Sequence, residues 1–415
     1  MPRTAERIWS VLMTVAATQA AVAVPPASGP WRGTIETPGG ELPFQFELAA
    51  AGDGWQAHLV NGPERIAIPT VRATGSELLL GIDHYDATLT GTLDASGRKL
   101  EGVYKRRRGA DKWGEARFVA VAGDAPRFAP DEESAGVTPA DFSGRWAVRL
   151  GNTDAVGVFE QTADGTALGT LLTPGGDYGQ LAGRVDGKRL RLSRFEGTHV
   201  LLFDGRLGGD GLIHGGMWTA FGSEETWRAQ RDPDARLPDS TQHPTAAVAK
   251  LDELQFRTVD GATVRLSDPQ FRGAGLVIEV LGTWCPNCHD AAVLLEELHR
   301  EFGGLGVAVV GLAFEVTGDF ERDAMMVKRY VERHKLTFPV LMAGRADKAE
   351  VAAKLPFLDG LKAYPTTIFL RGDGTVEAVH SGFSGPATGA DFQRQREEFE
   401  RAFKSLLSER KTDAP

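Results

Sequence analysis

Residues 279–288, Glu-Val-Leu-Gly-Thr-Trp-Cys-Pro-Asn-Cys, decide the fold of the C-terminal part of this chain. The apolar run that leads into them, Leu276–Leu281, predicts a buried β-strand, and the apolar spacing over residues 291–299 predicts a helix. A strand therefore delivers Cys285 to the start of a helix, where unpaired N–H groups and the positive end of the helix dipole stabilise a thiolate. Cys288 follows three residues later on the same helical face, within reach of a disulfide.

The chain has 415 residues and only two cysteines, both of which lie in this motif. Two cysteines three residues apart close a very short loop, so a bond between them stabilises the fold little by restricting the unfolded chain. The pair is therefore expected to serve redox chemistry, with Cys285 as the exposed attacking sulfur and Cys288 as the buried resolving sulfur. Pro286 suits the first helical turn because that position needs no N–H donor.

Strands and helices continue to alternate downstream of the motif. The sequence predicts an apolar strand, a helix, a two-stranded hairpin and a closing amphipathic helix, at residues 307–312, 323–334, 366–379 and 392–407. A β–α–β–α run followed by β–β–α is the order of the thioredoxin fold. We therefore expect an α/β thioredoxin-like domain over residues 248–410.

The motif resembles the active-site segment of the TlpA-like exported thiol–disulfide oxidoreductases of the thioredoxin superfamily, which carry Gly-Thr-Trp-Cys-x-x-Cys. A second segment, Tyr364-Pro365-Thr366-Thr367, is similar to the family's loop whose proline follows a cis peptide bond and faces the dithiol. The resemblance covers roughly residues 250–410. It implies an enzyme that reduces protein disulfides through a mixed disulfide on Cys285, which Cys288 resolves. It implies no cofactor and no metal beyond the redox-active disulfide itself.

The resemblance also suggests roles for neighbouring residues. Glu279 stands six residues before Cys285, where thioredoxin carries a buried acid, which implies that it accepts or shuttles the proton of Cys288. A carboxylate in an apolar strand loses hydration, so its pKa rises toward the range in which a base works near neutrality. A solvent-facing place for Glu279 on the strand is the alternative. Substrate contacts are expected from Trp284, Pro286, Asn287, Tyr364 and Pro365.

The sequence departs from the family pattern at two positions. Family members often place an acid three residues after the second cysteine, where this chain has Ala291, with Asp290 beside it. Thioredoxin also has a helix-kinking proline where this chain has Val293. Both departures leave the redox potential and the direction of the reaction open.

Other functions of the motif have weaker support. Cys-Pro-Asn-Cys-His, ending at His289, matches the attachment motif of c-type haem, but such a site belongs in a small helical domain, and His289 is expected on the helix surface. Peroxiredoxins resemble this domain, yet they place Thr or Ser three residues before the reactive cysteine. That position is Gly282 here, and Thr283 is one residue off, so a peroxiredoxin-like thiol peroxidase is the enzymatic alternative. No second Cys or His pair has the spacing of a zinc site.

The chain before the thioredoxin-like region is rich in β-structure signals. Proline-rich stretches at 123–141 and 231–247 are expected to be linkers. They bound residues 24–122 and 142–230, where apolar and polar residues alternate between glycine-rich turns, as is typical of antiparallel barrels or sandwiches. The two regions resemble each other, so we expect a duplicated β domain. The aligned segments are 31–35 with 142–146, 75–80 with 187–192, and 91–93 with 205–207.

The N-terminus has the pattern of a secretory signal peptide. Arg3 and Arg7 form a basic start, residues 8–17 are mostly apolar, and Ala21-Val22-Ala23 supplies the small residues of a cleavage site. Residues 1–23 are therefore expected to direct export to the periplasm or cell envelope.

Charge and family resemblance together define the expected partners. The net charge of −10 argues against nucleic acid, and the one basic cluster, Lys105–Arg108, is expected at a solvated hairpin end. Protein thiols and disulfides are the expected substrates, with a membrane-bound thiol protein as electron donor. The β domains are open to binding an unknown partner, so a ligand-binding module with an accessory redox domain is a further alternative.

Overall fold

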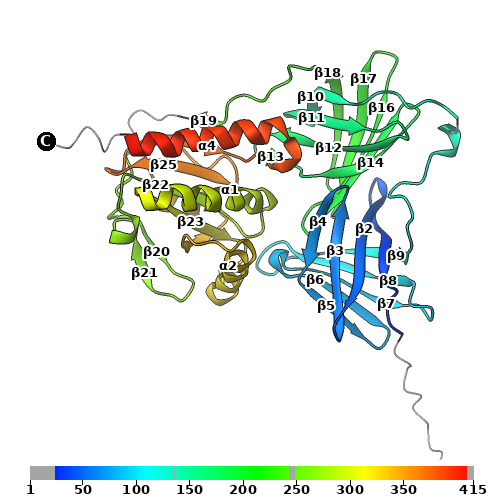
Figure 1. The fold of residues 1–415 in the computed structure, drawn as a ribbon, viewed down its shortest axis with the longest axis horizontal. Helices are drawn as coiled ribbons and strands as arrows, with labels where there is room; N and C mark the ends of the chain where they lie inside the picture. The colour runs from blue at the N-terminus through cyan, green and yellow to red at the C-terminus, as the bar shows by residue number, and fades with distance from the viewer. Residues whose placement is uncertain (1–23, 135, 243–247, 409–415) are drawn as a thin grey trace, which may run out of the picture.

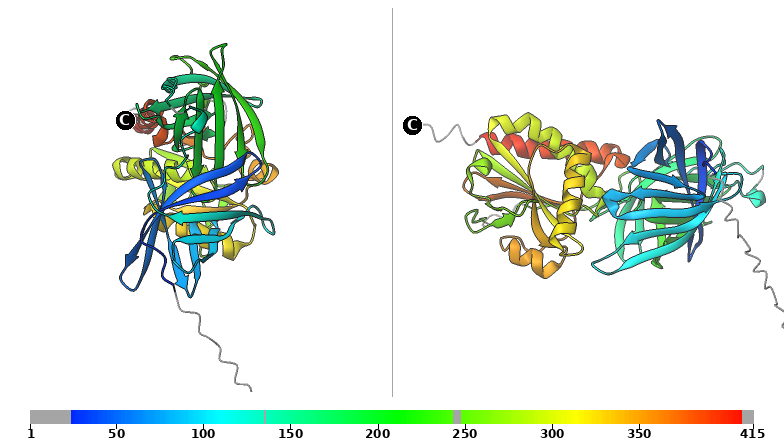
Figure 2. Two further views of the ribbon diagram at one scale, coloured as in Figure 1. Left: turned by 90° about the vertical axis from the view of Figure 1, so that its right-hand side faces the viewer. Right: turned by 90° about the horizontal axis from the view of Figure 1, so that it is seen from below.

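The computed structural model describes residues 24–134, 136–242 and 248–408, so the expected signal peptide at 1–23 lies outside the described residues. The described chain forms three β-sheets. Figures 1 and 2 show the two N-terminal sheets at one end of the molecule and the third sheet, with its helices, at the other. Over the described ranges, no helix combines the length and the apolar character that crossing a membrane requires.

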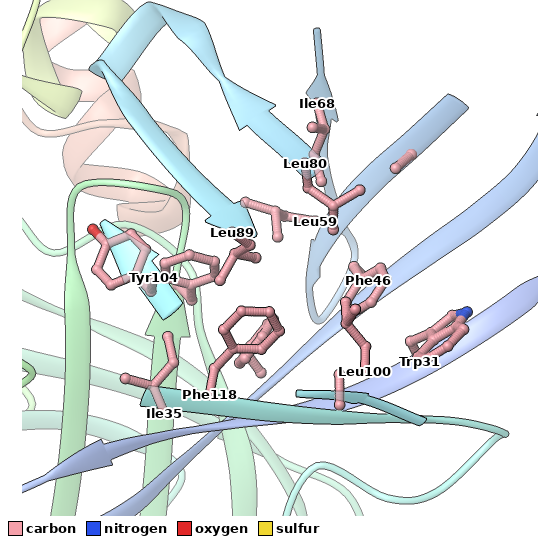
Figure 3. Close-up of a cluster of buried hydrophobic side chains, with 14 of the residues drawn as sticks. Trp31, Ile35, Phe46, Leu59, Ile68, Leu80, Leu89, Leu100, Tyr104 and Phe118 are labelled. Atoms are coloured by element: carbon pink, nitrogen blue, oxygen red, sulfur yellow. The ribbon is translucent and has the colours of Figure 1, made fainter. Parts of the chain in front are cut away.

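The first sheet is antiparallel and barrel-like, with strand order β4-β3-β2-β1-β9-β8-β7-β6-β5. Alternate residues face inward, as in β1, where Trp31 and Ile35 are buried and their neighbours are not. Figure 3 shows Trp31, Phe46, Leu59 and Phe118 meeting in the core between the strands. The elements are β1 Gly29–Thr37, β2 Gly40–Ala51, β3 Gly54–Asn61, β4 Glu64–Ile68, β5 Thr70–Thr74, β6 Glu77–Ile82, η1 Asp83–Tyr85, β7 Ala87–Leu93, β8 Lys99–Arg107 and β9 Trp113–Ala122.

The second sheet has the order β11-β10-β18-β17-β16-β15-β14-β12-β13, and β11 also pairs with β12, which closes the ring. Its core is built around Trp146, Phe203 and Trp227. The strands are β10 Gly144–Leu150, β11 Thr153–Gln161, β12 Thr166–Thr173, β13 Gly176–Asp177, β14 Leu181–Asp186, β15 Arg189–Phe195, β16 Val200–Leu207, β17 Leu212–Thr219 and β18 Glu224–Arg231.

The two β-sheets share local features. Gly75 and Gly187 both take positive φ in the turn before a corresponding strand, β6 and β15. The indole N–H groups of Trp31 and Trp146 each donate, at 2.9 Å, to the carbonyl oxygen four residues earlier. Trp31 therefore corresponds to Trp146, which shifts the alignment that the sequence favours for this segment by four residues. A common origin of the two domains stays a prediction.

The third sheet has the order β19-β26-β25-β22-β23-β24-β20-β21, with β22, β23 and β24 parallel, which confirms the expected thioredoxin-like order of elements. Every residue of β22 is buried. The strand β24 and the short helix α3 were not expected from the sequence. The elements are β19 Thr241–Gln242, β20 Gln255–Arg257, β21 Thr263–Arg265, β22 Gly275–Leu281, α1 Pro286–Phe302, β23 Val307–Glu315, α2 Phe320–His334, β24 Val340–Arg345, α3 Lys348–Lys354, β25 Thr366–Arg371, β26 Val376–Ser381 and α4 Ala390–Ser408.

The basic cluster joins the two β-sheets. The guanidinium groups of Arg106 and Arg108 lie over the ring of Phe221, between β17 and β18, at 5.7 and 5.2 Å from its centroid. Arg107 pairs with Asp86 at 2.6 Å. Arg106 and Arg107 are therefore only partly exposed, which departs from the expectation of a solvated hairpin end, whereas Arg108 is exposed at that end as expected.

Both β-sheets also contact the C-terminal domain. Asp86, which follows η1, accepts Arg322 of α2 at 2.8 Å. From the second sheet, Arg145 pairs with Asp391 of α4 at 2.6 Å. In addition, Asp177 of β13 accepts the backbone N–H of Gly385 at 2.5 Å. These contacts hold the N-terminal sheets against the end of the domain that carries the cysteines.

Candidate active site

Cys285 caps the N-terminus of α1, and its Sγ accepts the backbone N–H of Cys288 at 3.3 Å. On its other side, Cys285 Sγ donates to the carbonyl oxygen of Tyr364 at 3.6 Å. Both cysteines are free thiols. Cys285 is only 5% exposed, so the expectation of an exposed attacking sulfur is wrong for this conformation.

Cys288 is fully buried, as expected of a resolving thiol. Burial raises the pKa of Cys288 well above its usual value, and the hydrogen bond with Cys285 and the charge of Glu279 act in the same direction. The backbone around it is fixed because the Tyr330 hydroxyl donates to the Cys288 carbonyl at 2.6 Å. Cys288 therefore needs a base before it can act as a nucleophile.

Glu279 lies in the middle of β22 and is 1% exposed, so the solvent-facing alternative is wrong. Its Oε2 accepts the Thr367 hydroxyl at 2.6 Å, and Oε1 has no hydrogen-bond partner among the described residues. Burial raises the pKa of Glu279 to about 8, against the opposing effect of the Thr367 hydrogen bond. A carboxyl group with this pKa exchanges a proton near neutral pH, as a proton acceptor for Cys288 must.

The segment containing Tyr364 and Pro365 meets the motif on the side of Cys285. The peptide bond between these two residues is cis, and the Pro365 carbonyl accepts the Gly382 N–H at 2.8 Å. The ring of Trp284 packs edge-on against Tyr364, with centroids 5.1 Å apart, and its Nε1 donates to the Phe314 carbonyl at 3.0 Å. The structure thus brings Trp284 and Tyr364 together beside Cys285.

Asn287 and Pro286 face a different neighbour. A Cβ atom at Gly176 of β13 would lie 1.8 Å from Asn287 Nδ2. The second β-sheet therefore contacts the cysteine motif at a position where only glycine leaves room for the Asn287 side chain. Pro286 and Asn287 also line a cavity of about 130 Å³ that residues of both β-sheets complete, among them Glu64 and Arg194. In this conformation Asn287 contacts the β domain, and its expected substrate contact stays a prediction.

His289 is buried, so the expectation of a surface position is wrong. Its Nε2 donates to the Thr283 carbonyl at 2.8 Å, which leaves Nδ1 to accept His334 Nε2–H at 2.7 Å. Burial, with His334 and His84 nearby, lowers the pKa of His289 well below its usual value. Its ring also packs on Tyr85 of the first β domain, with centroids 4.9 Å apart. Both ring nitrogens are engaged within the protein, which does not favour a role as a haem ligand.

Glu315, a buried acid at the end of β23, was not among the site residues expected from the sequence. Its two carboxylate oxygens accept the N–H and the hydroxyl of Thr283, each at 2.8 Å. Burial raises the pKa of Glu315 to about 7. A sequence signal for Glu315 existed: it is an acidic residue at the end of an apolar strand, just as Glu279 is an acidic residue within one. Across the part of the chain that the structure describes, no group of three or more His, Cys, Asp or Glu side chains could hold a metal ion.

The C-terminal region, which contains this site, is similar to known proteins. Residues 246–379 match the model of the AhpC/TSA family. The C-terminal region is a thioredoxin-like domain. This domain is similar to the thiol-disulfide oxidoreductase ResA of Oceanobacillus iheyensis, with 27% identity over 124 residues, 30% of this chain and 57% of the relative. It is also similar to the thioredoxin-like protein YneN of Bacillus subtilis, with 26% identity over 130 residues, 31% of this chain and 68% of the relative.

The thioredoxin-like domain thus spans less than two thirds of the length of ResA. Among solved structures, a putative thiol:disulfide interchange protein DsbE from Chlorobium tepidum aligns with 40% of this chain and 100% of its own, at 17% identity and a TM-score of 0.31. A secreted thiol-disulfide isomerase from Corynebacterium glutamicum aligns with 43% of this chain and 95% of its own, at 19% identity and a TM-score of 0.32.

Proposed function

We propose that this chain is an exported dithiol–disulfide oxidoreductase that reduces protein disulfides through Cys285. The observation that carries the proposal is the asymmetry of the cysteine pair. Cys285 Sγ accepts an N–H at the start of α1, whereas Cys288 is fully buried near an acid, Glu279, whose pKa is about 8. One sulfur is thus placed where a thiolate is stabilised, and the other beside a proton acceptor.

The proposed reaction has two exchange steps. The Cys285 thiolate attacks one sulfur of the substrate disulfide, a mixed disulfide forms, and the other substrate sulfur leaves and takes a proton from solvent. Glu279 then accepts the Cys288 proton, and Cys288 Sγ attacks Cys285 Sγ. The Cys285–Cys288 disulfide forms, and the first substrate sulfur leaves as a thiolate that takes a proton from solvent. The substrate disulfide has gained two electrons from the cysteine pair. A thiol protein, proposed to be membrane-bound, must then supply two electrons to reduce the Cys285–Cys288 disulfide.

A thiol peroxidase is the alternative that this geometry favours less. Gly282 occupies the position where peroxiredoxins carry a hydroxyl residue, and the Thr283 hydroxyl is already bound to Glu315. No specific contact of Cys285 therefore suggests a peroxide site. Export rests on the sequence pattern of residues 1–23, and the common origin of the two β domains rests on their shared turns and tryptophans.

The test is reduction of a protein disulfide by the purified chain. With dithiothreitol as the electron source, the chain should accelerate reduction of insulin, followed by turbidity, over dithiothreitol alone. The Cys285→Ser variant should show no acceleration. The proposal fails if the native chain does not accelerate insulin reduction, or if it consumes hydrogen peroxide faster than it reduces any protein disulfide.

A further inference from the structure

Thr283 lies two residues before Cys285, and each of its polar groups forms a hydrogen bond within the protein. Its N–H and hydroxyl donate to the two oxygens of Glu315, both at 2.8 Å. Its carbonyl accepts His289 Nε2–H at 2.8 Å. Because Thr283 lies in the turn between β22 and α1, these three bonds fix where the turn delivers the Cys285 sulfur.

The Glu315 side of this turn leads to the first β domain. Glu315 Oε2 forms an ion pair at 3.8 Å with Arg322 Nη1, at the start of α2, and the same Nη1 donates to Asp323 Oδ1 at 2.8 Å. The other end of the same guanidinium, Nη2, donates to Asp86 Oδ2 at 2.8 Å. Asp86 in turn pairs with Arg107 of β8 at 2.6 Å. An unbroken series of charged groups therefore runs from the β domain to the active-site turn.

The contacts of His289, on the other side of the turn, also lead to the first β domain. The His289 ring lies edge-on to Tyr85 and to His84, with centroids 4.9 and 5.8 Å apart. Both of these residues belong to η1 and directly precede Asp86. Three consecutive residues of the first β domain thus lead to the groups that hold Thr283: His84 and Tyr85 contact His289, and Asp86 reaches Glu315 through Arg322.

We propose that the first β domain positions the active-site turn, and that Glu315 and Arg322 are the positioning residues through which Asp86 sets the redox equilibrium of the Cys285–Cys288 dithiol. The inference rests on the proposed function in that it assigns the dithiol a redox role. Glu315 is 1% exposed, and a buried carboxylate depends strongly on the groups that compensate its charge. Arg322 is the cation beside Glu315 and is shared with Asp86 and Asp323, so a change at Asp86 alters the charge balance around Glu315 and how firmly Glu315 holds Thr283.

The test is a double-mutant cycle on the full chain, with the equilibrium constant of the dithiol against glutathione as the readout. Asp86→Asn removes the charge alone, because Asn tolerates the left-handed backbone of this residue, φ 50°. Asp86→Asn and Glu315→Gln should each shift the constant by about threefold to tenfold, which lies in the lower part of the range of coupling energies within one ion-pair network. The double variant should shift it no further than Glu315→Gln alone, since both changes act along one route.

The matched control is Arg145→Gln, which breaks the ion pair between the second β domain and Asp391 and has no link to Thr283. It should leave the constant unchanged. The inference is overturned if Asp86→Asn has no effect, if the two effects add, or if Arg145→Gln shifts the constant equally. If the Glu315→Gln variant does not fold, the comparison of the equilibrium constants of Asp86→Asn and Arg145→Gln tests the inference by itself. The constant is measured with glutathione, so it gives an answer even where the chain reduces no protein disulfide.

Discussion

One oxygen of the Glu279 carboxylate accepts the Thr367 hydroxyl at 2.6 Å, and the other has no hydrogen-bond partner in the described part of the chain. The bond from β25 fixes the carboxyl group without neutralising it, while burial raises its pKa to about 8. Glu279 is thus held as an acid that releases its proton only in mildly alkaline solution, next to a thiol whose pKa is raised as well.

The first prediction concerns catalysis by Glu279. Glu279→Gln keeps an acceptor for Thr367 but cannot take a proton, so resolution of the mixed disulfide by Cys288 should slow by about 10²- to 10⁴-fold, the usual contribution of a general base. In the native chain the resolution rate should rise with pH up to about 8, where Glu279 loses its proton. Stopped-flow measurement of mixed-disulfide decay between pH 6 and 9 checks this. A variant with the native pH profile would remove Glu279 from the mechanism.

The second prediction concerns stability and the same carboxyl group. The pKa of Glu279 is raised in the folded chain, so its contribution to stability is fully present below its unfolded pKa, near 4.5, and is lost as pH rises through about 8. Glu279→Gln should therefore gain stability relative to the native chain at pH 9 and lose this advantage at pH 4. Urea unfolding at both pH values measures the difference. An equal difference at the two pH values would contradict the raised pKa.

The third prediction separates the roles of the two sulfurs. Cys288→Ser leaves Cys285 at the helix start and should accumulate mixed disulfides with protein substrates, because no thiol remains to resolve them. Cys285→Ser should trap none, since Cys288 is fully buried. Non-reducing gels of proteins incubated with each variant give the comparison. Trapping through Cys288 instead of Cys285 would reverse the assignment.

The site could be predicted from the sequence wherever its determinants are local. The cysteine motif, the apolar strand with Glu279 and the segment at Tyr364 lie within the thioredoxin-like domain, whose order of elements follows from hydrophobic periodicity. The burial of Cys285 and His289 could not be predicted. His289 is covered by Tyr85, about two hundred residues earlier in the chain, and no spacing pattern encodes a contact between domains.

The fourth prediction tests how the second β domain covers the motif. Gly176 has φ +129°, and a Cβ there would meet Asn287 Nδ2 at 1.8 Å. Gly176→Ala should therefore displace the Asn287 side chain or β13 from their contact and raise the rate at which iodoacetamide alkylates Cys285. Gly123→Ala is the matched control, because Gly123 has φ +143° but nothing within 4 Å of its Cβ position. It carries a similar backbone strain, about 1–3 kcal/mol, without the contact. Equal alkylation rates in the two variants would show that β13 does not limit access to Cys285.

The last prediction concerns His84, which is 4% exposed and whose two ring nitrogens have no hydrogen-bond partner among the described residues. Burial lowers the pKa of His84 to about 2, so the folded chain holds it neutral while the unfolded chain protonates it below about 6.5. Its contribution to stability is therefore present above pH 6.5 and is lost as pH falls toward 2.

His84→Phe removes two unsatisfied polar atoms and keeps an aromatic ring against Tyr85, so it should stabilise the chain by about 1–3 kcal/mol at pH 7. The gain should grow at pH 5, because the variant has one fewer group to protonate on unfolding. Urea midpoints at both pH values measure it, with His214→Phe, at the one exposed position of β17, as the control that should show no such gain. A loss of stability in His84→Phe at pH 7 would contradict the prediction.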